Sequence, residues 1–428
     1  MKKERLIASV LWIAMMASAV CAQSARPSAP STSSATPNKP ASQTLVMGGT
    51  AALFNSWQIR PNDNDGYFSS DIPQPVCGLD NGLFKIYIFT NFDYYPSKNF
   101  HNYSNAVRVG AINTPADTYQ LLSSNVANDA HSLPGTRWEF AAAGVANGTT
   151  SKLYLFGGKN SSGEFNEVYS YTPGTGFSSS AVTTIPTRNG IDGKRSGAVA
   201  VPAKGMIYLF GGQQGGNSVL KQVLEFDPQA NQFTSRVLAP MPEGFHGARG
   251  MTKAVGTDNY IYLVGARTTA YGAPNYKIYR FDVQSGVTQE IKDLNNPSAP
   301  LTIPDGSGYP MITWDPNGNV RIIAASANGS AGPWTWGNIQ AWILNDNYTL
   351  PNNGKATLTP APYNDAARAR DMAGAVKCGN GMYLIGGTYG HGTTFQNRGM
   401  LVDKLGGLTY GPVKTLDIKV KAISTTAP

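Results

Sequence analysis

A short apolar run that ends in two glycines recurs along the chain and limits what the chain can fold into. Three copies end in two glycines: MIYLFGG (206–212), KLYLFGG (152–158) and GMYLIGG (381–387). YIYLVGA (260–266) is a weaker copy, and KIYIFT (85–90) and VRIIAAS (320–326) follow the pattern without the glycines. Their third residues lie 54 to 67 positions apart, which is typical of repeat folds. Each run predicts one buried β-strand, because it is rich in Tyr, Ile, Leu and Phe and too short for a helix. The glycine pair permits backbone conformations closed to other residues and lets neighbouring chains approach closely.

The sequence around these runs predicts four strands in each repeat. The third repeat shows them best, with strands expected at 196–201, 206–210, 223–226 and 233–237. A tight turn at Lys204-Gly205 joins the first two strands, and Asp227-Pro228 begins the turn after the third. The six expected repeats span residues 77–130, 131–188, 189–245, 246–304, 305–365 and 366–417.

The motifs of these repeats resemble the kelch family. The resemblance rests on the runs YLFGG, IYLFGG and MYLIGG, on VLEFDP at 223–228, and on Met-Pro or Ile-Pro between repeats. It implies an all-β, six-bladed kelch-type β-propeller at 44–428, with seven blades as the alternative. A strand near Leu45 is expected to close the ring by pairing with residues 398–423. Phe177 and Phe233 stand where the family usually has Trp, which leaves the subfamily open.

The N-terminal residues indicate export. Residues 1–22 have a basic start, an apolar stretch and small residues at a cleavage site, and predict a signal peptide. Residues 23–43 are mostly Ser, Ala, Pro and Thr and predict a disordered tether. We therefore expect a secreted or extracellular protein, or a periplasmic one in a bacterium, with no membrane span after cleavage. A membrane anchor is the alternative, although the apolar stretch is short for one.

Charge and cysteine content bear on partners and on stability. The net charge is +8 over 428 residues, without a run of Lys or Arg, so nucleic acid binding is not expected. Once the signal peptide is removed, Cys77 and Cys378 are the cysteines that remain. They end the first strands of the first and last repeats, which become neighbours when the ring closes. A disulfide between them is therefore predicted.

Four arginines and three aromatic residues are the candidate ligand-binding residues. Arg195, Arg249 and Arg370 each lie 16 residues before the first glycine of their motif, and Arg137 lies 20 before its own. These positions are expected to share one mouth of the central channel with the loops after the second strands. The aromatic candidates in those loops are Trp334, Trp336 and Tyr389. Guanidinium groups and flat rings suit an acidic glycan or peptide, whereas a recurring arginine also suits a bracing role between blades.

The sequence carries no recognisable catalytic motif. The four histidines, His101, His131, His246 and His391, lack metal-ligand spacing, so no metal and no cofactor is expected. Nucleophile-elbow and phosphate-loop signatures are absent. Two function classes stay open. The favoured one is a secreted module that binds a protein or glycan, and the alternative is a sugar-active enzyme such as a carbohydrate oxidase or a sugar epimerase.

Overall fold

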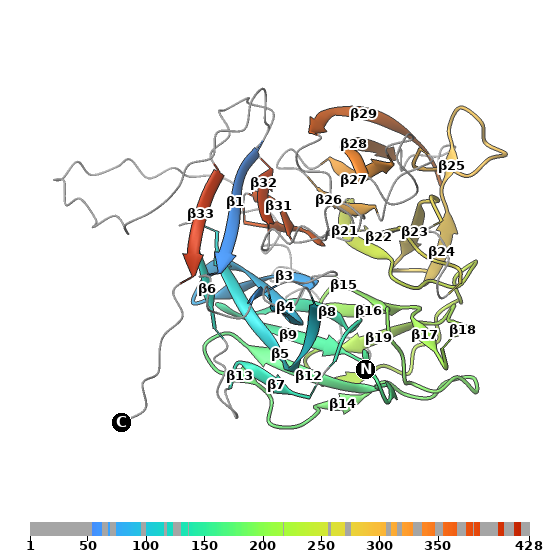
Figure 1. Cartoon of the computed structure of the whole chain (residues 1–428). Coiled ribbons are helices and arrows are strands. Elements are labelled where there is room, and N and C mark those ends of the chain that lie inside the picture. The colour runs from blue at the N-terminus through green and yellow to red at the C-terminus, as the bar shows by residue number, and fades with distance from the viewer. Residues whose placement is uncertain are drawn as a thin grey trace, which may run out of the picture. The chain divides into compact units, whose positions relative to one another are not determined.

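Every described element of the chain is a β-strand, as the recurring apolar runs predict. The computed structural model describes residues 54–61, 67–68, 74–95, 100–114, 118–122, 130–135, 137–216, 218–255, 258–269, 275–304, 310–314, 319–327, 336–346, 354–365, 374–379, 381–385, 401–405 and 415–420. All of them belong to one unit, residues 42–428. These residues contain no helix. The all-β prediction is therefore confirmed (Figure 1).

The third repeat forms a four-stranded antiparallel meander. Its strands are β15 (Val199–Ala203), β16 (Met206–Phe210), β19 (Val223–Asp227) and β20 (Gln232–Phe233). In β16, Ile207 and the three residues after it are all buried, because neighbouring sheets cover both faces of the strand. The fourth strand is shorter than predicted. It ends at Phe233, and Val237, expected within it, is 84% exposed.

The second and fourth repeats follow the same plan. The second sheet contains β8 (Ala141–Asn147), β9 (Thr150–Phe156), β12 (Glu167–Thr172), β13 (Gly176–Phe177) and β14 (Thr183–Thr184). The fourth contains β21 (Arg249–Val255), β22 (Asp258–Val264), β23 (Tyr279–Asp282) and β24 (Val287–Glu290). Two small ribbons follow the glycine pairs of the second and third repeats: β10 (Lys159–Asn160) with β11 (Gly163–Glu164), and β17 (Gln213–Gln214) with β18 (Ser218–Val219).

The first and fifth sheets have longer strands. The first contains β3 (Gln74–Asp80), β4 (Leu83–Tyr95), β5 (Phe100–Asn113) and β6 (Thr118–Leu121), joined by β2 (Tyr67–Phe68) and β7 (Ser132–Pro134). The fifth contains β26 (Met311–Trp314), β27 (Val320–Ala327), β28 (Trp336–Asp346), β29 (Lys355–Asp365) and β25 (Lys292–Asp293).

The last sheet combines the two ends of the described chain. It contains β30 (Gly374–Cys378), β31 (Gly381–Ile385), β32 (Leu401–Leu405), β1 (Phe54–Pro61) and β33 (Thr415–Val420). Strand β1 pairs antiparallel with β32 and parallel with β33. The predicted pairing of an N-terminal strand with C-terminal residues is confirmed. The strand lies further along the chain than expected, and Leu45 is outside the described residues.

The first strands of the sheets form a closed circuit. Strands β3, β8, β15, β21, β26 and β30 contact one another in that order, and β30 contacts β3. We call these six strands the inner strands. The core lies between consecutive sheets. Aromatic rings of β9, for example, pack edge-on against Phe226 of β19, with Tyr154 at 4.9 Å and Phe156 at 5.2 Å between ring centroids. This arrangement of sheets is a β-propeller.

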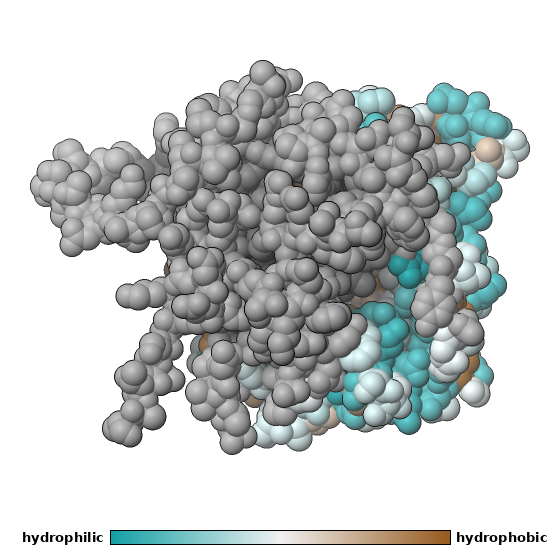
Figure 2. All heavy atoms as spheres, in the orientation of Figure 1, coloured by the Kyte–Doolittle hydropathy of each residue, from teal (hydrophilic) through white to brown (hydrophobic). Residues whose placement is uncertain are grey.

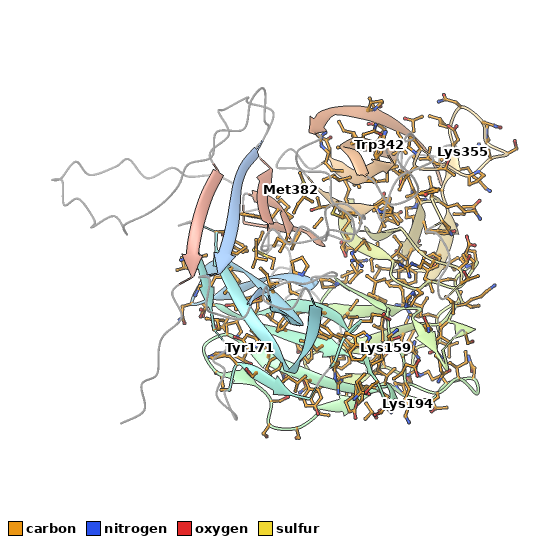
Figure 3. All side chains as sticks on the ribbon, in the orientation of Figure 1. Lys159, Tyr171, Lys194, Trp342, Lys355 and Met382 are labelled. Atoms are coloured by element: carbon orange, nitrogen blue, oxygen red, sulfur yellow. A yellow bond between two sulfur atoms is a disulfide. The ribbon has the colours of Figure 1, made fainter. Side chains whose placement is uncertain are left out.

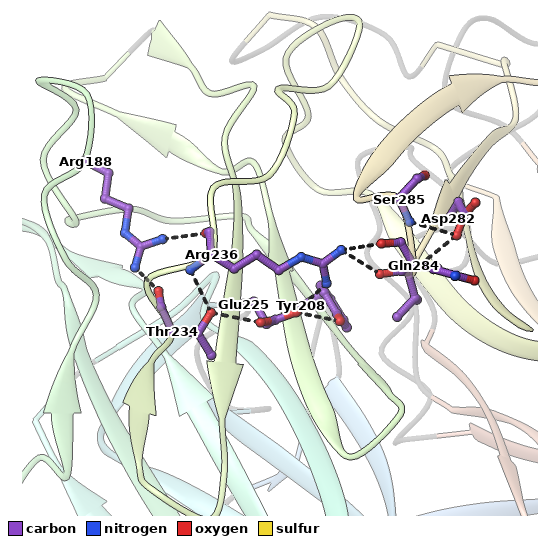
Figure 4. A network of polar contacts seen from close by, with 9 residues as sticks. Arg188, Tyr208, Glu225, Thr234, Arg236, Asp282, Gln284 and Ser285 are labelled. Carbon is purple, nitrogen blue, oxygen red and sulfur yellow. Dashed lines mark hydrogen bonds and ion pairs between the residues drawn. The ribbon is translucent and has the colours of Figure 1, made fainter.

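A disulfide and a polar network add links between the sheets. Cys77 of β3 and Cys378 of β30, the two cysteines selected from the sequence, form a disulfide with Cα atoms 5.2 Å apart. Figure 4 shows a network centred on Glu225, which accepts hydrogen bonds from Tyr208 at 2.7 Å and Arg236 at 2.9 Å. Arg236 also donates to the carbonyl oxygen of Gln284 in the fourth repeat at 2.7 Å.

Candidate functional site

The glycine pairs Gly157-Gly158 and Gly211-Gly212 directly follow strands β9 and β16, beside the start of the inner strand of the same hairpin. We call this end of the ring the strand-start end. Gly211 has φ +60°, and a Cβ there would lie 2.2 Å from the carbonyl oxygen of Phe245, in the segment that leads into the inner strand β21 of the next sheet. Gly212 donates its N–H to that same oxygen at 2.7 Å. Gly157 meets the carbonyl oxygen of Arg195 in the same way. Two glycines are therefore needed where one repeat lies on the backbone of the next.

Arg195 is a buried brace at the strand-start end. Its side chain donates to the carbonyl oxygens of Gly193 at 3.1 Å and Gly211 at 3.2 Å, and to Oε1 of Gln222 at 2.6 Å. The residue is 1% exposed. Burial lowers the pKa of its guanidinium to about 10, which leaves it charged at neutral pH. The prediction that Arg195 lines an open mouth is wrong, because its donors already satisfy groups inside its own repeat.

Arg137 occupies the equivalent position in the second repeat. It donates to the carbonyl oxygen of Gly157 at 2.9 Å and pairs with Glu167 at 3.4 Å. Its guanidinium lies 4.1 Å from the ring centre of Phe165. Arg137 is 7% exposed, so its placement in an open mouth is also corrected. The second interpretation of the recurring arginine, a bracing role, fits both side chains.

Arg249 is not structurally equivalent to Arg195, although each lies 16 residues before the first glycine of its motif. It pairs with Val264, directly before the glycine, at the place that Val199 takes in the third repeat. Hairpin β21–β22 has longer strands than β15–β16, so the equivalent of Arg195 is Phe245. Arg249 is half-buried. Its guanidinium donates to the carbonyl oxygens of the two residues before it, at 3.3 and 3.4 Å.

The other predicted ligand-binding residues receive less support. Arg370, Trp334 and Tyr389 lie outside the described residues. Trp336 was expected in a loop after the second strand but begins strand β28, where its backbone pairs with Ala327. Of the predicted ligand-binding residues that the structure describes, Arg137 and Arg195 are buried and Arg249 is half-buried.

A charged cluster at the strand-start end was not anticipated from the sequence. One carboxylate oxygen of Glu139 lies 2.8 Å from Nζ of Lys159 and 3.3 Å from Nε2 of His246. Lys159 is labelled in Figure 3. Glu139 precedes the second inner strand and His246 the fourth, so their contact passes over the third repeat. Burial raises the pKa of Glu139, but its bonds to His246 and Lys159 outweigh this and lower the pKa to about 2.

Further polar residues lie at equivalent positions next to Glu139 and His246, just before the inner strands. The residue before Glu139, Trp138, forms a bridge with Lys159, and His246 forms the equivalent bridge with Arg267. Together with Arg249, these residues make up what we call the strand-start cluster: Trp138, Glu139, Lys159, His246, Arg249 and Arg267. It contains three permanent cations and one carboxylate. In the second, third and fourth repeats, the inner strand begins at the residue that pairs with the last residue before the glycine. Aligning the repeats on that pair, instead of on the glycine, would have placed these residues at equivalent positions and so predicted the cluster.

The described residues restrict other kinds of site. They contain no group of three His, Cys, Asp or Glu side chains placed to hold a metal ion. Nor is there, within the same residues, a helix long and apolar enough to cross a membrane. The described surface visible in Figure 2 is largely hydrophilic, with small hydrophobic areas.

Comparisons with known proteins agree with this architecture. Residues 116–301 match the KLHDC2/KLHL20/DRC7 Kelch-repeats domain. The solved structure of YjhT is similar, with a TM-score of 0.50 and 16% identity, over 80% of this chain and 96% of the other. At that identity the similarity supports a shared fold only. No curated protein matches the chain. The fold and its recurring doublets define a kelch-type propeller. Residues 116–301 of the chain belong to the kelch-repeat family.

Proposed function

We propose that this chain is a binding module that holds an acidic protein segment at the strand-start end of its propeller. The observation that carries the proposal is the strand-start cluster, in which Lys159, Arg249 and Arg267 outnumber the single carboxylate of Glu139. Kelch propellers commonly bind proteins, and a cationic end favours a partner of opposite charge. The half-buried indole of Trp138 adds an aromatic surface of the kind that anchors protein partners.

A paired screen tests this proposal. The purified protein is applied to an array of acidic and neutral peptides and to an array of charged and neutral glycans. We expect acidic peptides to bind, and Arg249→Ala to weaken binding about tenfold, because a charge-assisted hydrogen bond contributes roughly 1.5 to 3 kcal/mol. Binding to glycans alone would replace the protein partner by a sugar. Unchanged binding by Arg249→Ala would place the ligand elsewhere on the molecule.

The alternative of a sugar-active enzyme has less support at this end. An epimerase requires a carboxyl or imidazole group that exchanges a proton near neutral pH. Glu139 and His246 are neighbouring acid and base candidates, but the low pKa of Glu139 keeps it a carboxylate that already accepts two bonds. Turnover of a glycan found in the screen would restore the enzyme as the better interpretation.

We also propose that the chain is exported and that its propeller has six blades. The disulfide between Cys77 and Cys378 supports export, since disulfides persist in oxidising compartments. A mature N-terminus at Gln23 in protein recovered from the medium or the periplasm is the expected finding. The closed circuit of six inner strands supports six blades over seven. An experimental structure with a seventh sheet between β30 and β3 would overturn that count.

A further inference from the structure

Glu139 adopts a backbone conformation that glycine takes in the neighbouring repeats. Its φ is +52°, while Gly197 and Gly247, two residues before the equivalent strand positions, have φ of +63° and +71°. The three residues form a chain of backbone hydrogen bonds. Gly197 donates to the carbonyl oxygen of Glu139, and Gly247 to that of Gly197, both at 2.7 Å. A glutamate in this conformation is strained by about 1 kcal/mol or more, and such strain concentrates at functional sites.

The imidazole of His246 has a site built for it. Its ring packs on Gly197, where a Cβ would lie 2.2 Å from the ring, so a side chain there would expel the imidazole. His246 is 5% exposed. Its Nε2 faces Glu139, and its buried Nδ1 has no hydrogen-bond partner among the described residues. The imidazole is therefore held in place by packing and is not fixed by a second hydrogen bond.

We propose that Lys159 and His246 form a carboxylate-binding site, which Glu139 occupies in the free protein and which an acidic side chain of the partner takes over on binding. The site has two nitrogen atoms, Nζ of Lys159 and Nε2 of His246, that share one carboxylate oxygen. The exchange rests on the proposed function, since it requires an acidic partner. The binding site itself does not.

The geometry supports an exchangeable carboxylate more than a purely structural ion pair. The side chains of Glu139 and Lys159 are 21% and 19% exposed, whereas Arg195 is 1% exposed. Lys159 lies in strand β10 and His246 lies three residues before strand β21. Arg267 pairs with His246, and Arg249 begins the strand that follows; both side chains are positively charged and favour the approach of a carboxylate.

Rescue by a small carboxylate tests the site without any partner. Glu139→Gly removes the carboxylate and relieves the backbone strain. Its melting temperature is measured at pH 7 in rising sodium acetate and in sodium chloride of equal ionic strength. We expect acetate to raise the melting temperature of Glu139→Gly saturably, by about 2 °C, because a ligand that binds only the folded state stabilises it. Wild type and the double variant Glu139→Gly/Lys159→Met should show no difference between the two salts.

The outcomes separate the site from the proposed function. No acetate effect on Glu139→Gly, or the same effect on all three proteins, overturns the carboxylate site. If Glu139→Gly does not fold in sodium chloride, the variant is refolded in each salt and the yield of soluble protein is measured. A higher yield in acetate than in chloride then replaces the rise in melting temperature. Rescue by acetate together with failure of every acidic peptide in the screen would keep the site and reject the acidic protein partner.

Discussion

Two arginines that look alike in sequence have different environments in the structure. Arg195 lies inside its repeat, where it satisfies two carbonyl groups and an amide. Arg249 is half-buried at the start of its inner strand. Arg195 therefore stabilises the fold, because a guanidinium that is 1% exposed and hydrogen-bonded inside its repeat is not accessible to a ligand, whereas the half-buried Arg249 is partly exposed.

Removing Arg195 should destabilise the protein strongly. Arg195→Ala leaves the carbonyl of Gly211 and the amide of Gln222 buried with fewer partners, and each unsatisfied buried group costs about 1 to 3 kcal/mol. We expect the free energy of unfolding in urea to fall by about 3 kcal/mol or more. Lys194→Ala, at the exposed neighbouring position, is the matched control and should change it by less than about 0.5 kcal/mol. Equal effects would contradict the bracing role.

Glu139 should make stability depend on pH in the acid range. Its pKa is lowered to about 2 in the folded protein, against about 4.3 in an unfolded chain. The stabilisation is therefore present above about pH 4.5 and is lost as the pH falls toward 2. Melting curves between pH 3 and 7 should show the difference between wild type and Glu139→Gln shrinking toward acid. A difference that stays constant over this range would show that the carboxylate is not stabilised in the fold.

At the scale of elements, the glycine pairs combine two separate requirements. They need a positive φ, and they need an absent side chain where the next repeat packs on them. Gly215 isolates the first requirement, because its φ is +59° and a Cβ there would meet nothing within 4 Å. Gly211 has both, with φ +60° and the carbonyl oxygen of Phe245 only 2.2 Å from where a Cβ would lie.

The two glycines should respond differently to the same substitution. Gly215→Ala should cost about 1 to 2 kcal/mol from backbone strain alone. Gly211→Ala adds displacement of the next repeat, so we expect a loss of stability larger by about 2 kcal/mol or more. Denaturant unfolding of both variants gives the comparison. Equal losses would mean that the doublet serves only the turn and not the contact between repeats.

At the scale of the whole molecule, the apolar runs and glycine pairs, with the kelch resemblance that they carry, were sufficient to predict an all-β propeller. The strand β16, the antiparallel meander around it and the pairing of β1 with β32 follow from local patterns and from the need to close a ring. The length of each hairpin could not be predicted from these local patterns. Counting from the glycine assigned Arg249 to the place of Arg195, because the longer strands β21 and β22 leave no signal in the motif itself.

The contact between Glu139 and His246 was also beyond local reasoning. The two residues lie 107 positions apart and precede inner strands separated by another repeat. Each is an ordinary residue in its own segment. The two residues meet because the closed ring brings the starts of the inner strands together. Aligning the described repeats shows, in addition, that Glu139 stands where Gly197 and Gly247 stand in the next two.

The affinity of a selected acidic peptide for two charge-reversed variants tests the central claim most directly. Arg267→Glu changes the strand-start cluster, while Lys204→Glu changes an exposed turn at the opposite end of the inner strands. We predict that Arg267→Glu weakens binding at least about tenfold, with the loss shrinking as salt screens the charges, and that Lys204→Glu leaves binding unchanged. Equal binding by Arg267→Glu, or a larger loss with Lys204→Glu, would contradict a ligand site at the strand-start end.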